Sequence, residues 1–297
     1  MKNKFILLLL LLNLFFCIDY SNNIYSISSS SRNAALGSLK ISSGNISSVF
    51  DAPLEKNENN FYFSYSSEFN GYIDLFHLGY GFNFNPNIII GFGLVFRGIN
   101  EGFYTSDAWN DNGNGYIEIE EIDYSQINSF SDNELGLLIS FNKIFNKNSI
   151  LCYKIKPNYH TIGSYNAFGL SFDVSYYKRL NNNSFLIGIN DVFSQKKWNY
   201  SHTEKFERRF FLNYMYKFKK VLFSFEFDNL SNYKAGIEYK VIELLSFRLG
   251  NSNSNLSFGF GFNSEFIDVD YAFILNNELF IDESHKIDFI FKFKNNS

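Results

Sequence analysis

Large apolar residues alternate with small or polar residues over long stretches of this chain. Phe258, Phe260 and Phe262, for example, are separated by Gly259 and Gly261. Successive side chains of a β-strand point to opposite faces of the sheet. The segment therefore predicts a strand with one strongly apolar face and one face that tolerates water.

The same alternation recurs along the chain and predicts a succession of antiparallel strands. The count of plausible strands is about fourteen, with about twelve or sixteen as neighbouring even numbers, because single-chain bacterial barrels have even strand numbers. An even number lets the last strand pair with the first, which removes exposed edges. The clearest apolar runs lie at residues 61–65, 76–84, 88–96, 168–176, 221–227 and 287–293. Asn-rich turn signals lie at residues 85–87, 146–148, 181–183, 251–255 and 276–277.

The residues opposite the apolar face favour a membrane barrel over a soluble two-sheet sandwich. A sandwich would present Lys and Glu to bulk water, whereas here this face is largely Gly, Ser, Asn and isolated charges. A charge on a lipid face costs about 2–4 kcal/mol at the bilayer midplane. Tyr65, Tyr80 and Tyr176 lie near the ends of runs, as in aromatic girdles. The predicted fold is all-β, a transmembrane antiparallel β-barrel.

The N-terminus reads as a secretion signal. Residues 1–4 carry two lysines, and residues 5–16 are apolar except for Asn13. This core is too short to span a bilayer as a stable helix, and a cleavage point near Ser26 is expected. The predicted organisation is a signal peptide (1–26), an N-terminal segment rich in Ser and Asn (27–56), the barrel (57–293) and a C-terminal overhang (294–297).

Composition supports the barrel. The 297 residues include 37 Phe and 20 Tyr but only 3 Pro, which favours strands. The mean hydropathy of −0.15 is too low for a helical membrane protein but suits a barrel with a polar lumen. A net charge of −4 leaves no basic footprint for nucleic acid. Phe15 and Phe16 are too bulky for a lipoprotein site at Cys17, and cleavage leaves Cys152 without a disulfide partner.

One loop resembles a calcium-binding loop. Asn110, Asn112, Asn114 and Glu121 fall at ligand positions of an EF-hand pattern, with Gly115 at the required turn. Asn replaces the usual first Asp, and no helical pattern flanks the loop. Asn-Gly repeats also form ordinary turns, because both residues tolerate positive φ. We therefore interpret the loop as a turn and expect neither metal nor cofactor.

No catalytic constellation stands out. The four His residues are scattered without metal-ligand spacing, and no nucleophile, base and orienting group can be grouped specifically. We therefore expect no enzymatic activity. Charges on the predicted lumen face could gate a solute path or pair into a network that fills the lumen, and the similar number of both signs favours the network. The lumen-facing candidates are Arg97, Asp173, Glu226, Asp228, Glu238, Arg248 and Asp270.

Several short segments resemble the PorV/PorQ family of outer-membrane proteins. Residues 32–37 (Arg-Asn-Ala-Ala-Leu-Gly) resemble its N-terminal motif, and residues 164–170 (Ser-Tyr-Asn-Ala-Phe-Gly-Leu) resemble a central one. Residues 236–239 (Gly-Ile-Glu-Tyr) and 247–251 (Phe-Arg-Leu-Gly-Asn) resemble two later pieces. Residues 51–54 (Asp-Ala-Pro-Leu) depart from the family's Asn-Pro element. The resemblance extends from about residue 32 to residue 293.

The resemblance implies a FadL-like barrel in the cell outer membrane, with the N-terminal segment near or inside the lumen. For PorQ-like members it implies a non-enzymatic scaffold or anchor of the type IX secretion system attachment complex. The implied partners are outer-membrane lipid, lipopolysaccharide and PorZ-, PorU- and PorV-like proteins. The alternative function is a FadL-like channel for hydrophobic solutes, with a lateral opening at a kink such as Gly91/Gly93.

The C-terminus bears on membrane insertion. Insertion signals of such barrels usually end on an aromatic residue, and Phe293 occupies that place before the overhang. We interpret Phe293 as the insertion signal.

Overall fold

The computed structural model describes residues 20–21, 24–27, 30–41, 44–55, 60–105, 107–110, 113–116, 119–230, 232–253, 255–276 and 283–293. Most of the predicted signal peptide and all of the overhang lie outside these ranges. Within them, no helix has the length and apolar character needed to cross a bilayer.

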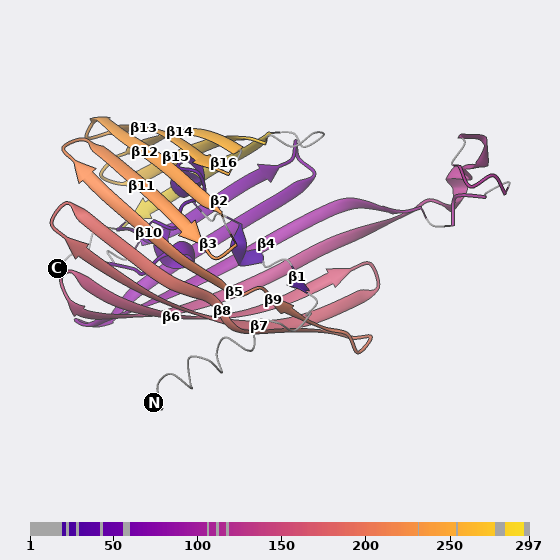
Figure 1. The fold of residues 1–297 in the computed structure, drawn as a ribbon, viewed down its shortest axis with the longest axis horizontal. Coiled ribbons are helices and arrows are strands. Elements are labelled where there is room, and N and C mark those ends of the chain that lie inside the picture. The colour runs from indigo at the N-terminus through magenta and orange to yellow at the C-terminus, as the bar shows by residue number, and fades with distance from the viewer. Residues whose placement is uncertain are drawn as a thin grey trace.

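Fourteen antiparallel strands close into a barrel (Figure 1). The sheet has 16 strands, but β1 (Tyr20–Ser21) and β9 (Thr203–Phe206) lie outside the ring. The last strand pairs with the first, β16 with β2, so the predicted closure and strand number are confirmed. The ring consists of β2 (Asn60–Glu68), β3 (Ile73–Asn85), β4 (Ile88–Tyr104), β5 (Asn128–Asn146), β6 (Ser149–Ile162), β7 (Tyr165–Leu180), β8 (Asn183–Trp198), β10 (Arg209–Phe218), β11 (Val221–Asp228), β12 (Tyr233–Ile242), β13 (Leu245–Ser252), β14 (Asn255–Asn263), β15 (Ile267–Leu275) and β16 (Ser284–Lys292).

The wall of the barrel is much taller on one side than on the other. Strand β5 has 19 residues, whereas β11 and β13 have 8 each. Figure 1 shows β4 and β5 continuing away from the barrel as a long arm. Its tip, residues 105–127, contains the short turns η3 (Ile119–Glu121) and η4 (Tyr124–Gln126).

The two ends of the barrel differ in their connections. At the end opposite the arm, here called the turn end, two-residue turns join the strands at 86–87, 147–148, 181–182, 219–220 and 243–244. Asn181 and Lys219 take the left-handed conformation, with φ of 54° and 52°, that such tight turns require. Short turns mark the periplasmic end of an outer-membrane barrel. The predicted Asn-rich clusters at 146–148 and 181–183 lie at this end.

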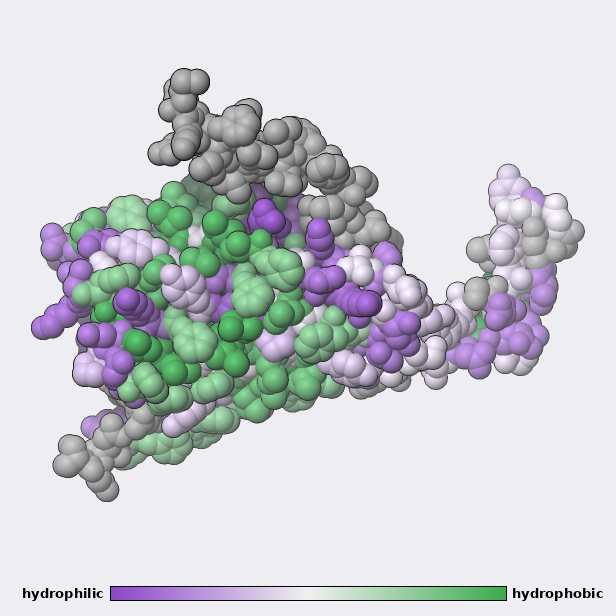
Figure 2. Space-filling view, turned by 90° about the horizontal axis from the view of Figure 1, so that it is seen from below, coloured by the Kyte–Doolittle hydropathy of each residue, from purple (hydrophilic) through white to green (hydrophobic). Residues whose placement is uncertain are grey.

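The alternation sorts apolar residues outward and polar residues inward. Phe258 and Phe260 are 41% and 44% exposed on the outer face, whereas Ser257 is 2% exposed. Figure 2 shows hydrophobic residues around the wall and hydrophilic residues at its left margin and along the arm. An apolar exterior around a charged interior is the reverse of a soluble protein and suits a wall in contact with lipid.

The N-terminal segment lies inside the barrel, as expected. Its described residues from 24 to 55, here called the plug, include η2 (Ile24–Ser26), α2 (Ser31–Ala35) and α3 (Ser48–Asp51). Apolar plug residues form two clusters with the wall. In one, Val49 and Phe50 pack with Tyr62 and Leu138. The other contains Leu36, Leu39, Ile41, Phe211 and Met215.

Candidate functional site: the plugged lumen and a break in its wall

Helix α2 is held at its beginning by strand β16. The Asp288 carboxylate accepts hydrogen bonds from the Ser31 backbone N–H (2.5 Å) and the Ser31 hydroxyl (2.7 Å). Ser30 Oγ accepts from the Asn33 N–H at 3.1 Å. The first N–H groups of a helix lack partners within the helix and bear partial positive charge. A carboxylate from the wall therefore fixes both the position and the direction of α2.

Glycines on the inner face of the short wall leave room for the plug. A Cβ atom at Gly250 would lie 2.7 Å from Leu36 Cα, and one at Gly259 would collide with Ala35 Cβ. Ser257 Oγ donates to the Ala35 carbonyl at 3.1 Å. The small residues opposite the outward Phe face therefore receive α2 and the turn after it. We call these positions the glycine cradle, which consists of Gly236, Gly250 and Gly259.

Ion pairs extend from the plug into the short wall. Arg32 Nε lies 2.8 Å from Glu238 Oε2. Glu238 also pairs with Arg248 Nε (2.8 Å), and Arg248 Nη1 lies 2.5 Å from Asp270. The chain alternates in sign, so each buried charge has an opposite neighbour, which buried charges require.

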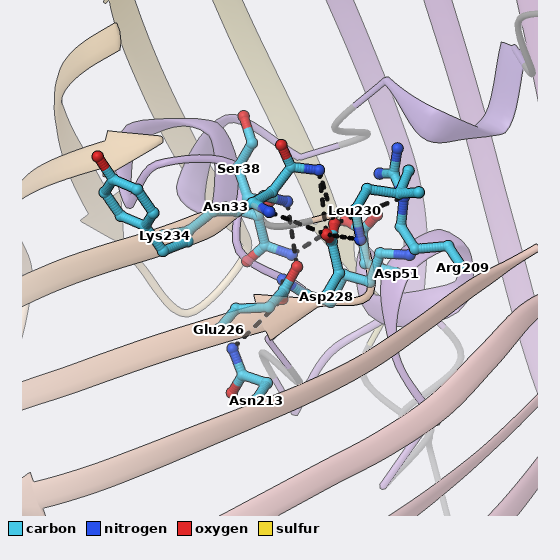
Figure 3. A network of polar contacts seen from close by, with 12 residues as sticks. Asn33, Ser38, Asp51, Arg209, Asn213, Glu226, Asp228, Leu230 and Lys234 are labelled. Atoms are coloured by element: carbon cyan, nitrogen blue, oxygen red, sulfur yellow. Dashed lines mark hydrogen bonds and ion pairs between the residues drawn. The ribbon is translucent and has the colours of Figure 1, made fainter. Parts of the chain in front are cut away.

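A second polar network joins the plug to β11 and β12 (Figure 3). Lys234 Nζ donates to the Ser38 carbonyl at 2.7 Å and lies 3.1 Å from Glu226 Oε1. The other Glu226 oxygen accepts from the Lys40 backbone N–H at 2.7 Å. Glu226 therefore holds the plug directly through the Lys40 backbone N–H, and its ion-pair partner Lys234 holds the plug through the Ser38 carbonyl.

Asp228, at the end of β11 nearer the arm, makes further contacts in this network (Figure 3). Its carboxylate lies 3.6 Å from Arg209 Nε and accepts from the Leu230 N–H at 2.9 Å. Within the plug, Asn33 Nδ2 donates to Asp51 at 3.0 Å, which ties α2 to α3.

The tall wall carries its own buried ion pairs. Lys156 Nζ lies 2.7 Å from Asp173 and 2.8 Å from Asp191. Asp191 has a φ of 53°, and its backbone N–H donates to Asp173 at 2.9 Å. Arg97 lies 3.3 Å from Glu134. The charges pair between neighbouring strands of the same wall instead of forming a file of one sign.

The structure places the predicted lumen candidates on the inner face of the wall. Sequence reasoning missed Arg32, Tyr25 and the glycine cradle. The Gly/Ser alternation marked the cradle as a spacious face, but no sequence signal connects it to the plug. The seven candidates in this inward set are Arg97, Asp173, Glu226, Asp228, Glu238, Arg248 and Asp270.

Pro157 interrupts the tall wall between β5 and β6. The strands pair at Gly136 with Asn158 and at Ile139 with Ile155, but the two rungs between them are not paired. Proline has no N–H to donate to a ladder. From inside the barrel, Tyr25 Oη lies 2.5 Å from the Leu137 carbonyl oxygen and 2.6 Å from that of Pro157. The plug therefore covers a break that the wall cannot close by itself.

Tyr25 keeps the proton that this contact needs. Burial raises the pKa of Tyr25, and the nearby Glu134 carboxylate raises it further, so the phenol is neutral and donates. Tyr25 and Ile24 lie within the predicted signal peptide, yet both are packed against the wall of the lumen. Cleavage near Ser26 stays a prediction. A role for Tyr25 in the mature protein requires that the signal peptide is cleaved before Ile24.

An apolar pocket lies on the outside of the wall at this break. Its volume is about 360 Å³, and its lining includes Leu137, Leu138 and Pro157 together with Tyr80 and Phe92. Leu138 also belongs to the apolar cluster inside the lumen. Apolar surfaces therefore lie on both sides of the unpaired rungs.

The predicted kink at Gly91/Gly93 is absent, although Gly93 lines the outer pocket. Strand β4 pairs without interruption with β3 and β5 around both glycines. A Cβ at Gly91 would lie 2.6 Å from Val49, and one at Gly93 would lie 2.6 Å from Phe50. These glycines make room for the plug and do not kink the wall.

The Asn-Gly loop lies at the tip of the arm. The Glu121 carboxylate accepts from Trp109 Nε1 at 2.9 Å, and Asn114 Oδ1 accepts from the Tyr116 N–H at 2.7 Å. Asn110 N–H donates to the Glu121 carbonyl at 2.9 Å. These contacts are those of folded turns. Asn112 lies outside the described residues.

No protein-family model and no curated protein matches the chain. Several solved structures do match. The monoaromatic hydrocarbon channel CymD is 10% identical with a TM-score of 0.64, covering 92% of this chain and 99% of its own. The toluene transporter TodX of Pseudomonas putida is 11% identical with a TM-score of 0.61, covering 91% and 98%. A FadL homologue of Pseudomonas aeruginosa is 9% identical with a TM-score of 0.54, covering 93% and 100%. At these identities the likeness shows the fold, a FadL-type 14-strand barrel.

Proposed function

We propose that this protein is a non-enzymatic outer-membrane channel that admits small hydrophobic solutes sideways through its wall. The proposal rests on the break at Pro157. An apolar pocket lies outside this break, and the Tyr25 hydroxyl covers it from inside. The structural neighbours that are named as hydrocarbon channels support it.

The proposed route leads from the outer apolar pocket to an apolar cluster in the lumen. A solute in the outer pocket meets Leu137 and Pro157 at the unpaired rungs. Inside, the next surface is the apolar cluster that contains Ile24, Val49 and Phe50. A shift of the η2 turn would remove the Tyr25 hydroxyl from the rungs and expose that cluster. An apolar solute then passes from one apolar surface to another, beside the Lys156 ammonium, which lies 5.3 Å from the Tyr25 ring and is already paired with Asp173 and Asp191.

Two substitutions at the break test the route because they act in opposite directions. Tyr25→Phe removes the hydroxyl that covers the Leu137 and Pro157 carbonyls, so we expect faster entry of a hydrophobic fluorescent probe into cells that make the protein. Pro157→Val restores a ladder N–H, so we expect slower entry. Tyr153→Phe, on the outer face of the same strand and 47% exposed, is the matched control.

Surface amounts of the four proteins are equalised by quantifying the folded barrel on gels. Probe entry that moves in the same direction in both variants, or that equals entry in cells without the protein, would contradict the proposal.

A second candidate function is the PorQ-like scaffold of the type IX attachment complex. The arm supports it, because its tip lies far from the barrel and exposes Tyr116, Ile119 and Tyr124 at 76%, 74% and 65%. Hydrogen bonds from Ser125 lower the pKa of Asp123, which keeps one acidic group at the tip charged. Exposed apolar residues beside carboxylates suit contact with a partner protein.

The scaffold function predicts that PorZ- or PorU-like proteins co-purify with the native barrel. Replacing residues 105–127 with a short turn should abolish this co-purification and leave probe entry unchanged. Equal recovery of partners with and without the arm would count against this function.

A further inference from the structure

A cavity at the turn end of the lumen gathers positive charge. Its volume is about 390 Å³, and it lies between the ends of β7, β8, β10, β11 and β12 and the plug. Glu238 is the one acidic residue in its described lining. The cationic residues that line it are Arg32, Arg179, Lys217, Lys219, Lys220 and Lys240. A chain with a net charge of −4 thus concentrates six of its 26 cationic residues at one cavity.

Neighbouring acids neutralise only part of this charge. Arg32 pairs with Glu238, and Arg179 pairs with Glu55 of the plug. Among the described residues, no acidic group lies within ion-pair distance of the Lys217 or Lys240 ammonium group. Like charges held together without counter-charges repel one another, and a bound anion relieves the repulsion.

Arg32 lines the cavity and has an unused donor beneath its surface. Arg32 uses Nε and Nη2 for Glu238, at 2.8 Å and 3.2 Å. Its Nη1 is buried and has no hydrogen-bond partner among the described residues. Other protein atoms cover Nη1, so an anion in the cavity would reach it only after the Arg32 side chain turns, and that contact would then satisfy the donor.

We propose that this turn-end cavity binds a small, multiply charged anion with phosphate or carboxylate groups. Arg32 would hold one anionic group at the floor, and Lys217 and Lys240 would hold another at the rim. Because the cavity lies inside the ring of strands, the ligand enters from the aqueous side of the turn end. The site is separate from the Pro157 break and does not depend on the proposed solute route.

Calorimetric titration of the full-length protein with inorganic pyrophosphate tests the site. We expect saturable binding at low salt that weakens as salt is added, because ions screen exposed charges. The double variant Lys217→Gln/Lys240→Gln should weaken the affinity by about tenfold or more, since it removes two charge-assisted contacts. Lys143→Gln/Lys147→Gln removes the same charge at the same end, outside the cavity, and should leave the affinity unchanged.

A lipid headgroup could supply the same phosphate chemistry as a free solute, and nanodiscs distinguish the two. We expect equal pyrophosphate affinity in nanodiscs of phosphatidylcholine alone and in nanodiscs that also contain phosphatidylglycerol. Competition by phosphatidylglycerol would overturn the aqueous route. Absence of saturable binding, or equal weakening by both double variants, would overturn the site itself.

Discussion

Single small residues decide where the plug can lie. At Gly250 the backbone of the plug passes so close that any side chain would meet it, and Gly259 is in similar contact with Ala35. On the opposite wall, one proline removes a ladder donor and one tyrosine from the plug covers the resulting break. Residues without charged side chains therefore determine where the plug lies and where the wall is unpaired.

We expect Gly250→Val to displace the plug. The new side chain would occupy the place of Leu36, and overpacking of this kind costs about 1–3 kcal/mol when the neighbours can shift. Hydrogen exchange at residues 31–37 should become faster, while the barrel still forms. Leu249→Val, on the outer face of the same strand, is the control and should leave the exchange unchanged. Unaltered protection in Gly250→Val would contradict the cradle.

The partly buried Lys40 predicts a pH dependence of stability. Burial lowers the pKa of Lys40 from 10.5 to about 8, although the Glu226 carboxylate opposes the shift. Between these two values the unfolded chain binds more protons at this site than the folded one, so the free energy of unfolding rises with pH across this window. Lys40→Met lacks this titration. Denaturant unfolding at either end of the window should show the native protein gaining up to about 3 kcal/mol relative to the variant.

At the scale of elements, the barrel and its additions differ in how they are stabilised. Helix α2 has 5 residues, too few to be stable alone, and it exists because Asp288, Glu238 and the cradle hold it. The arm tip is stabilised by contacts among its own described residues. One example is the hydrogen bond from the Asp123 N–H to the Ala108 carbonyl at 2.7 Å.

Removing the arm tip should therefore leave the barrel stable. With residues 105–127 replaced by a two-residue turn between Tyr104 and Asn128, which lie opposite each other, we expect the free energy of unfolding to change by less than about 0.5 kcal/mol. Denaturant unfolding in detergent measures it. A larger loss would show that the tip packs on the barrel.

At the scale of the whole molecule, closure and an apolar exterior suit the barrel to a membrane. Every ring strand has two neighbours, so the wall presents no free edge among the described residues. The buried charges lie inside, where the plug and neighbouring strands supply their partners.

The predicted insertion signal at Phe293 can be tested by the amount of folded barrel. Phe293 is 58% exposed at the end of β16, and Phe293→Ala should lower the amount of folded barrel in the outer membrane. Deleting residues 294–297 should have a smaller effect. Gel mobility with and without heating distinguishes folded from unfolded barrel. A larger loss on deleting the overhang would disprove the role of Phe293.

The sequence alone determined the strands, their inward and outward faces, the turns and the membrane barrel. Period-two alternation is local, and a one-residue slip would reverse both faces, so the pattern specifies orientation wherever one face meets lipid. The sequence also predicted the charged inner residues and a FadL-like fold. It placed the lateral opening at a kink at Gly91/Gly93, which the structure does not have.

Only the tertiary structure decided what the inner face touches. Arg32 meets Glu238 across 206 residues of chain, and Tyr25 reaches Pro157 across 132. Such contacts depend on barrel curvature and on the path of the plug, which no local pattern records. For the same reason, no local pattern sets Pro157 apart in the sequence. Its place beside an apolar pocket, and the gathering of cations at the turn end, became visible only when distant strands were brought together.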